Sequence, residues 1–142
     1  MIAVNVNVSG PLFRVAPRAE EVIHRAANGT INELVDLGMD QLSQMLRPRP
    51  AGVYLSVQQA QKGHASVGHY RRMLHQEVRD LYGRLDDSGV VYGPWLEGTG
   101  SRNATTRFKG YGVFRRVKTF LDGKVKQVAQ AHVRRAVAEL NG

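Results

Sequence analysis

The sequence predicts an α+β fold, in which a long N-terminal helix and a C-terminal helix pack on a small antiparallel sheet. Three observations support this class. Residues 17–47 and 110–140 each carry apolar side chains every three or four positions, as amphipathic helices do. Residues 1–10 alternate apolar and polar side chains, as a half-buried strand does. At 142 residues, the chain is most simply a single domain spanning 1–142.

The N-terminal segment has the period of a strand. Three valines at every second position alternate with two asparagines, and Gly10-Pro11 ends the pattern. Such a strand or arm can join the sheet of its own chain, or it can pair with an exposed strand edge on a neighbouring subunit. Both pairings are open from the sequence, and the intramolecular one is preferred.

The segment 17–47 is predicted to form the first long helix. Pro17 and two glutamates in the first turn favour a helix start, and Arg47-Pro48 favours an end. Asn28-Gly29 is a point where this helix can bend. The stripe is typical of a core helix lying on a sheet, and a partner-binding helix is the alternative. Its members are Ile23, Ala27, Ile31, Leu34, Gly38, Leu42 and Met45.

The segment 52–87 is predicted to contain antiparallel strands and a long loop. Residues 52–59 alternate as a strand does, and the glycine-containing polar stretch 59–68 is the loop. Residues 69–87 fit either a helical stripe or two strand faces. Gly83 favours strands, because glycine in a helix interior costs about 1 kcal/mol relative to alanine. Asp86-Asp87-Ser88-Gly89 then forms a turn.

Residues 89–100 are predicted to form a short aromatic and glycine-rich knuckle. Tyr92 and Trp95 are three residues apart, which places them on one face of a single helical turn. Pro94 suits the start of that turn and Gly98 suits its end. Because buried aromatic side chains mostly pack, we expect the knuckle to anchor a polar loop over residues 100–106 to the core.

The positive charge is concentrated in the C-terminal third. The net charge is +8, and ten of the twenty basic residues lie between Arg102 and Arg135, where Asp122 is the only acid. The helix predicted over 110–140, with a possible kink at Gly123, is therefore basic. Its charge can grip nucleic-acid phosphates, meet an acidic protein surface or simply face solvent. Few aromatic residues interleave with the basic ones, so base stacking is not expected.

The residues give no pattern for catalysis, a cofactor or a metal. Cysteine is absent, the five histidines form no pair with metal-ligand spacing, and no serine elbow occurs. Gly98–Gly100 lacks the spacing of a phosphate-binding loop. Glu97 is the one acid in the knuckle. It can act as a base, but we rather expect it to cap backbone N–H groups or to pair with Arg102 or Arg107. No apolar run approaches the ~20 residues that span a bilayer, and the N-terminus lacks a signal-peptide pattern.

The stretch 92–100 reads YGPWLEGTG, with a tyrosine, a glycine, a proline, an aromatic residue, an acid and Gly-Thr in order. This motif, within about residues 50–142, resembles the head-to-tail joining (neck or tail-completion) proteins of long-tailed bacteriophages. The chain departs from that family at Leu96 and Glu97, near where an aromatic residue is common. The candidate structural or interface residues are Tyr92, Gly93, Pro94, Trp95, Glu97, Gly98, Thr99, Gly100, Arg102, Arg107 and Phe108.

The resemblance implies an antiparallel sheet just before the tyrosine motif, so we predict strands near 69–78 and 80–86. It also implies a structural virion protein, assembled in the host cytoplasm, that forms a ring around the DNA channel, commonly six- or twelve-fold. The implied partners are other copies of the chain, the portal-side head connector, the tail proteins and the nearby DNA, with no membrane. The candidate docking elements are residues 59–68, residues 100–106 and the N-terminal strand.

Three other functions stay open from the sequence. A tail terminator that caps the tail tube is the nearest, because the motif does not distinguish positions within the neck. A basic nucleic-acid-binding module of unrelated function is the second, on the strength of the C-terminal charge. A small enzyme using Glu97 is the third and has only one placed acid in its favour.

Overall fold

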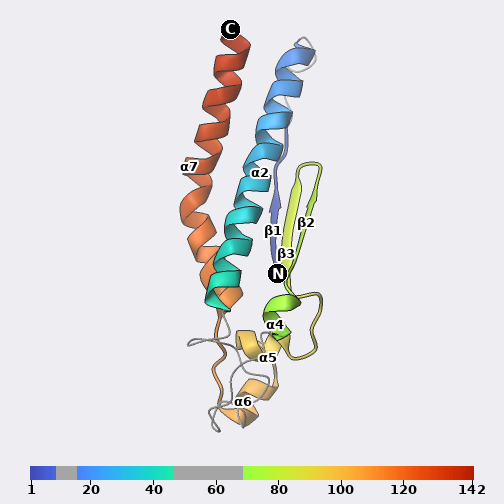
Figure 1. The fold of residues 1–142 in the computed structure, drawn as a ribbon, viewed down its shortest axis with the longest axis vertical. Coiled ribbons are helices and arrows are strands. Elements are labelled where there is room, and N and C mark those ends of the chain that lie inside the picture. The colour runs from blue at the N-terminus through green and yellow to red at the C-terminus, as the bar shows by residue number, and fades with distance from the viewer. Residues whose placement is uncertain (9–15, 47–68) are drawn as a thin grey trace.

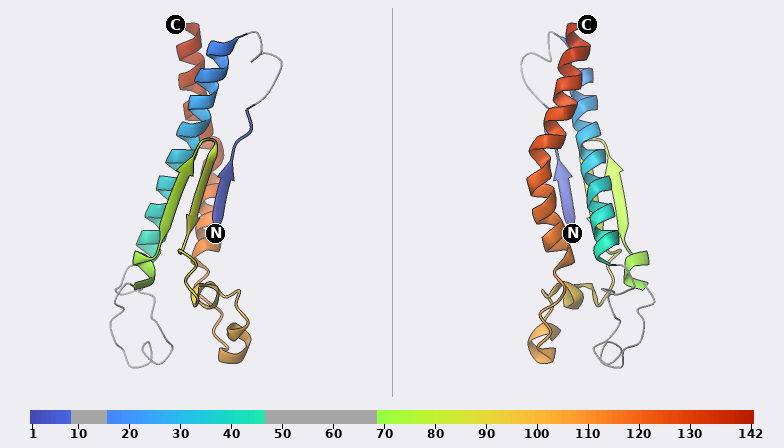
Figure 2. Two further views of the ribbon diagram at one scale, coloured as in Figure 1. Left: turned by 90° about the vertical axis from the view of Figure 1, so that its right-hand side faces the viewer. Right: turned by 60° about the vertical axis from the view of Figure 1, so that its left-hand side comes forward.

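The computed structural model describes residues 1–8, 16–46 and 69–142, and it has the α+β architecture that the sequence predicts. Two helices of 29 residues each, α2 (Pro17–Met45) and α7 (Val113–Asn141), run antiparallel and side by side. A three-stranded antiparallel sheet lies along one side of this pair (Figures 1 and 2). Three short helices lie at the end where α2 finishes and α7 begins: α4 (His69–Arg72), α5 (Gly93–Glu97) and α6 (Arg102–Thr106).

The sheet has the order β1-β3-β2, with β1 at Ile2–Asn5, β2 at His75–Arg79 and β3 at Tyr82–Asp86. The central strand β3 is antiparallel to both neighbours, and Ile2 pairs with Leu85. The N-terminal strand therefore pairs within its own chain, which confirms the preferred arrangement. Its predicted alternation is also confirmed, because the even-numbered side chains of residues 2–8 are covered and the odd-numbered ones are exposed.

Two glycines let α2 approach its neighbours closely. A Cβ on Gly83 of β3 would lie 2.6 Å from Val35 Cγ2 and 2.7 Å from Ile31 Cγ2 on α2. A Cβ on Gly38 of α2 would lie 2.5 Å from Leu85 Cδ1 on β3 and 3.0 Å from a methyl group of Leu121 on α7. These positions lack room for a side chain, so the sheet, α2 and α7 share one continuous core.

The tip of the β2–β3 hairpin is tied to α2 by polar side chains. The backbone N–H of Leu81, a residue with φ of 52°, donates to Asn28 Oδ1 at 2.7 Å. Asn28 Nδ2 donates to Asp80 Oδ1 at 2.9 Å, and His24 Nε2 lies 2.6 Å from the same oxygen. The hydrogen bonds from Asn28 and then His24 lower the pKa of Asp80. These contacts fix the height of the hairpin along α2.

Several predicted boundaries need correction. The strand expected over 69–78 begins at His75, because residues 69–72 form α4, in which the buried Tyr70 side chain faces inward. The strand expected over 80–86 begins at Tyr82, because Asp80 and Leu81 make the two-residue turn. The expected polar loop over 100–106 is wrong from Arg102 onward, because α6 occupies 102–106.

Both long helices agree with prediction apart from their ends. Helix α2 stops at Met45 instead of Arg47, and α7 runs over 113–141 instead of 110–140. Gly112 has φ of 59°, a left-handed conformation that cannot belong to the helix and that delays its start. Helix α2 continues through Gly29 and helix α7 continues through Gly123, both without interruption.

The predictions for the strand 52–59 and the loop 59–68 lie outside the described residues. Across the parts that the structure does describe, no helix is both long enough and apolar enough to cross a membrane. Beyond the hairpin tip, α2, α7 and residues 6–8 line an apolar groove of about 350 Å³, with Ile23, Ala27, Val133 and Val137 among its walls.

Candidate functional site

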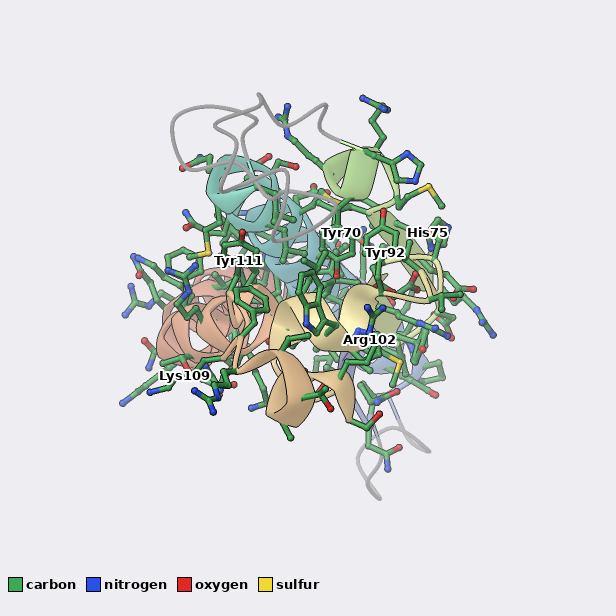
Figure 3. The ribbon with its side chains drawn as sticks, turned by 90° about the horizontal axis from the view of Figure 1, so that it is seen from below. Tyr70, His75, Tyr92, Arg102, Lys109 and Tyr111 are labelled. Carbon is green, nitrogen blue, oxygen red and sulfur yellow. The ribbon has the colours of Figure 1, made fainter. Side chains whose placement is uncertain are left out.

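The residues singled out by the motif form one corner of the molecule, between the end of β3 and the start of α7 (Figure 1). Figure 3 looks onto this end of the molecule and labels Tyr92, Arg102, Lys109 and Tyr111 around the short helices. We call residues 87–112 the corner. Its geometry decides how α7 leaves the sheet, because no other described segment links β3 to that helix.

The predicted knuckle is present as α5. Pro94 lies in its first turn, and Gly98 ends it in the left-handed conformation, with φ of 94°. The Pro94 carbonyl accepts hydrogen bonds from three backbone N–H groups, at 3.0 Å from Gly98, 2.9 Å from Thr99 and 3.1 Å from Gly100. These backbone hydrogen bonds hold one helical turn and its glycine exit together.

Gly98 and Gly110 form a close backbone crossing at the centre of the corner. A Cβ on Gly98 would overlap the Lys109 carbonyl oxygen, and a Cβ on Gly110 would overlap the backbone of Gly98. Beside the crossing, the Tyr111 N–H donates to the Leu96 carbonyl at 2.6 Å. Both glycines have positive φ, so conformation and space independently require glycine there.

Asn103 fastens three segments of the corner, although it is not among the candidate residues predicted from the sequence. Its Oδ1 accepts from the Gly100 N–H at 2.9 Å. Its Nδ2 donates to the carbonyls of Trp95 at 2.9 Å and Phe108 at 2.6 Å. The only sequence signal was an asparagine in a glycine-containing stretch, a residue that often bonds to nearby backbone.

The aromatic side chains of the corner stack in a row. The rings of Trp95 and Phe108 have centroids 4.7 Å apart, and those of Phe108 and Tyr111 are 5.2 Å apart. Trp95 Nε1 donates to Thr106 Oγ1 at 3.0 Å, which fixes α6 to α5. Trp95 is half-buried and Leu96 beside it is buried, so the predicted anchoring role is confirmed, with Leu96 the deeper anchor.

Glu97 caps the N-terminus of α7. Its two carboxylate oxygens accept from the backbone N–H groups of Phe114, at 3.1 Å, and Arg115, at 2.9 Å. The N-cap residue itself is Gly112, which has no side chain to offer. The expectation that Glu97 caps backbone N–H groups is confirmed, and the capped groups belong to α7. Within the described residues, Glu97 forms no ion pair with Arg102 or Arg107.

We predict that Glu97→Ala lowers the free energy of unfolding by about 1–2 kcal/mol, the usual cost of losing a helix cap. Glu97→Gln should cost less, because an amide oxygen still accepts one hydrogen bond but no longer favours the positive helix end. Urea denaturation measures both. Glu139→Ala on the last turn of α7 is the control, because it removes only an exposed ion pair with Arg25 at 3.2 Å, which should cost less than about 1 kcal/mol. Equal losses for Glu97→Ala and Glu139→Ala would show that the cap contributes nothing specific.

A second group of contacts holds the start of the corner. The Tyr70 hydroxyl donates to Asp87 Oδ2 at 2.9 Å, and the rings of Tyr70 and Tyr92 are 5.9 Å apart, as Figure 3 shows them adjacent. Burial first, and then the Asp87 carboxylate, raise the pKa of Tyr70 above its usual range. Gly93 packs directly against Asp87. Asp86 accepts from the Ser88 N–H at 2.7 Å, so the predicted role of the two aspartates as turn formers is confirmed.

The remaining candidate residues face solvent. Thr99, Arg102 and Arg107 are exposed, and neither arginine has an ion-pair partner among the described residues. Arg107 has φ of 57°, a conformation that non-glycine residues rarely adopt. No group of three or more metal-ligating side chains gathers in the described segments. What the corner does chemically is orient α7 and display cations beside it.

Comparison of the chain with models of protein families, with curated proteins and with solved structures finds no match. A functional conclusion therefore depends on the residues of the corner and on the surfaces that it orients.

Proposed function

We propose that this protein is a structural component of the head–tail junction of a long-tailed bacteriophage. In this role it forms a ring around the DNA channel and joins the head connector to the tail. The structural role of residues 92–100 is the observation that carries the proposal. The backbone of residues 92–100 holds the turn of the corner, and the Glu97 carboxylate caps α7. These residues therefore have a structural role.

A fixed corner suits a protein that works by assembly. In a closed ring, every subunit repeats the same head-to-tail contact, and a small error in the direction of a long helix accumulates around the ring. The crossing of Gly98 and Gly110 and the Glu97 cap fix the start of α7 to the corner, and packing on α2 holds the rest of the helix. This rigidity supports a role in which α7 presents a surface to a neighbouring subunit.

The proposal is tested by deleting the gene from the phage genome that carries it and viewing the particles by electron microscopy. We expect filled or emptied heads and finished tails that remain unjoined. Intact infectious virions in the absence of the protein would end the proposal. A tail terminator, the nearest rival, predicts a different defect, since an uncapped tail tube is left with an unfinished end.

A nucleic-acid-binding module is the second candidate, and the cations around the corner favour it. In the corner and the first turn of α7, five exposed basic residues have no ion-pair partner among the described residues: Arg102, Arg107, Lys109, Arg115 and Arg116. This function requires the isolated protein to bind duplex DNA with an affinity that falls steeply as salt rises. Fluorescence anisotropy with a labelled duplex at about 50 and 200 mM salt tests this function, and absence of binding at the lower salt would rule it out.

A further inference from the structure

One side of α2 carries only negative charge. Glu33, Asp36 and Asp40 are three and four residues apart, so they share one side of the helix, and all three are exposed. No lysine, arginine or histidine occurs from residue 26 to residue 46. Glu33 lies 2.8 Å from His132 of α7, whereas the two aspartates have no ion-pair partner among the described residues. We call Asp36 and Asp40 the acidic face, because Glu33 is already paired with α7 of its own chain.

The outer side of α7 carries mainly positive charge. Arg115, Arg116 and Lys126 are exposed, and none of them pairs with an acid in the described segments. The one acid between them, Asp122, is held by Lys118 at 2.9 Å. We call these three residues the basic face.

The two faces cannot meet within one chain. The acidic face lies opposite the side of α2 that buries Ile31, Leu34 and Val35. The basic face lies opposite Val117 and Leu121, the side of α7 that packs toward α2. Each face therefore lies on the side of its helix opposite the shared core, and the two helices lie side by side (Figures 1 and 2).

The two faces also lie at the same height. Gly38 of α2 is against Leu121 of α7, and Gly29 is against His132. Because the helices are antiparallel, these contacts place Asp36 and Asp40 level with the stretch between Arg116 and Lys126. A contact between faces of equal height relates two copies by rotation with little shift along the long axis, which is the condition for a closed ring.

We propose that the basic face of α7 docks on the acidic face of α2 of a second copy of this chain. The inference rests on the ring assembly proposed above and assigns its repeating contact. Exposed ion pairs each contribute little stability, so their role is to select the partner and set the register. Each copy then contacts one neighbour through its basic face and the other neighbour through its acidic face, as a head-to-tail ring requires.

Cross-linking of introduced cysteines tests the contact, because the native chain contains none. Chains carrying both Asp36→Cys and Lys126→Cys are treated with a short bis-maleimide at high protein concentration. We expect a ladder of covalent oligomers. The control pairs Lys126→Cys with Gln76→Cys, an exposed position on the edge strand β2. A yield no higher than that of the control overturns the inference.

Charge reversal then tests specificity on the same cross-linking background. Asp40→Lys or Arg116→Glu alone should reduce the oligomer yield about tenfold, and the two together should restore it, because complementary charge is re-established. Both positions are exposed, so thermal unfolding should be unchanged. Failure of the double reversal to restore the yield overturns the inference. So does an unchanged yield accompanied by loss of DNA binding, which favours the nucleic-acid role.

The outcome separates this contact from the proposed function. If the native protein forms rings that do not depend on these faces, the contact is wrong while the junction role stands. If phage particles are joined normally without the protein, the junction role is wrong whatever the cross-linking shows.

Discussion

Gly98→Ala is expected to lower the free energy of unfolding by about 2–5 kcal/mol. The left-handed conformation of Gly98, with φ of 94°, costs a residue with a Cβ about 1–2 kcal/mol. The new methyl group would also overlap the Lys109 carbonyl oxygen. Backbone cannot turn away as a side chain does, so the overlap adds about 1–3 kcal/mol of overpacking. Gly110→Ala should cause a comparable loss, because it meets the backbone of Gly98 from the other side.

Two other glycines give matched controls. Gly89 has φ of 70° but a Cβ there would meet nothing within 4 Å, so Gly89→Ala should cost only the conformational part, about 1–2 kcal/mol. Gly123 lies inside α7 with open space around it, so Gly123→Ala should stabilise by up to about 1 kcal/mol. Urea denaturation of the four variants measures the series. Equal losses for Gly98→Ala and Gly89→Ala would refute the close crossing.

Trp95→Ala is the second large effect, with an expected loss of about 2–3 kcal/mol. A fully buried tryptophan would give about 3–5 kcal/mol, but this ring is only half-buried. The variant loses the stacking on Phe108, with centroids 4.7 Å apart, and the hydrogen bond to Thr106 at 3.0 Å. Because both contacts hold α6 against α5, we expect assembly to fail together with stability.

Trp95→Phe separates the two contacts. It keeps an aromatic ring against Phe108 and removes the bond to Thr106, so it should cost about 1 kcal/mol. Val91→Ala is the exposed control, since Val91 is 96% exposed, and it should change stability by less than about 0.5 kcal/mol. A fully stable Trp95→Ala protein that still fails to assemble would identify the ring as a docking contact instead of an anchor.

Local patterns were sufficient for the long elements. The stripe of α2 was read correctly because Ile31, Leu34 and Leu42 recur with the helical period and are all buried. The strand β1 was read correctly because its alternation is strict. The secondary structure of residues 69–79 is harder to predict, because Tyr70 lies in a short helix and Val78 lies in a strand. Both residues nevertheless fit one alternating pattern. Burial of Tyr70 against the corner decides between them, and that contact is not local.

The corner could be located from its composition but not built from it. Glycine, proline and aromatic residues at close spacing predicted a turn that ends at Gly98, which the structure confirms. The crossing partner Gly110 is twelve residues further on, and no local rule pairs the two. The same holds for Glu97, whose capped N–H groups lie seventeen and eighteen residues away. Such contacts depend on the path that the chain takes through α6 before it comes back to α5.

The most direct test of the central claim is a joining reaction in vitro. Heads and tails purified from phage that lack this gene are mixed with the purified protein, and infectious particles are counted. The account predicts that the native protein restores infectivity, that Gly89→Ala does so as well, and that Gly98→Ala does not. Infectious particles formed equally well without any added protein would contradict the account.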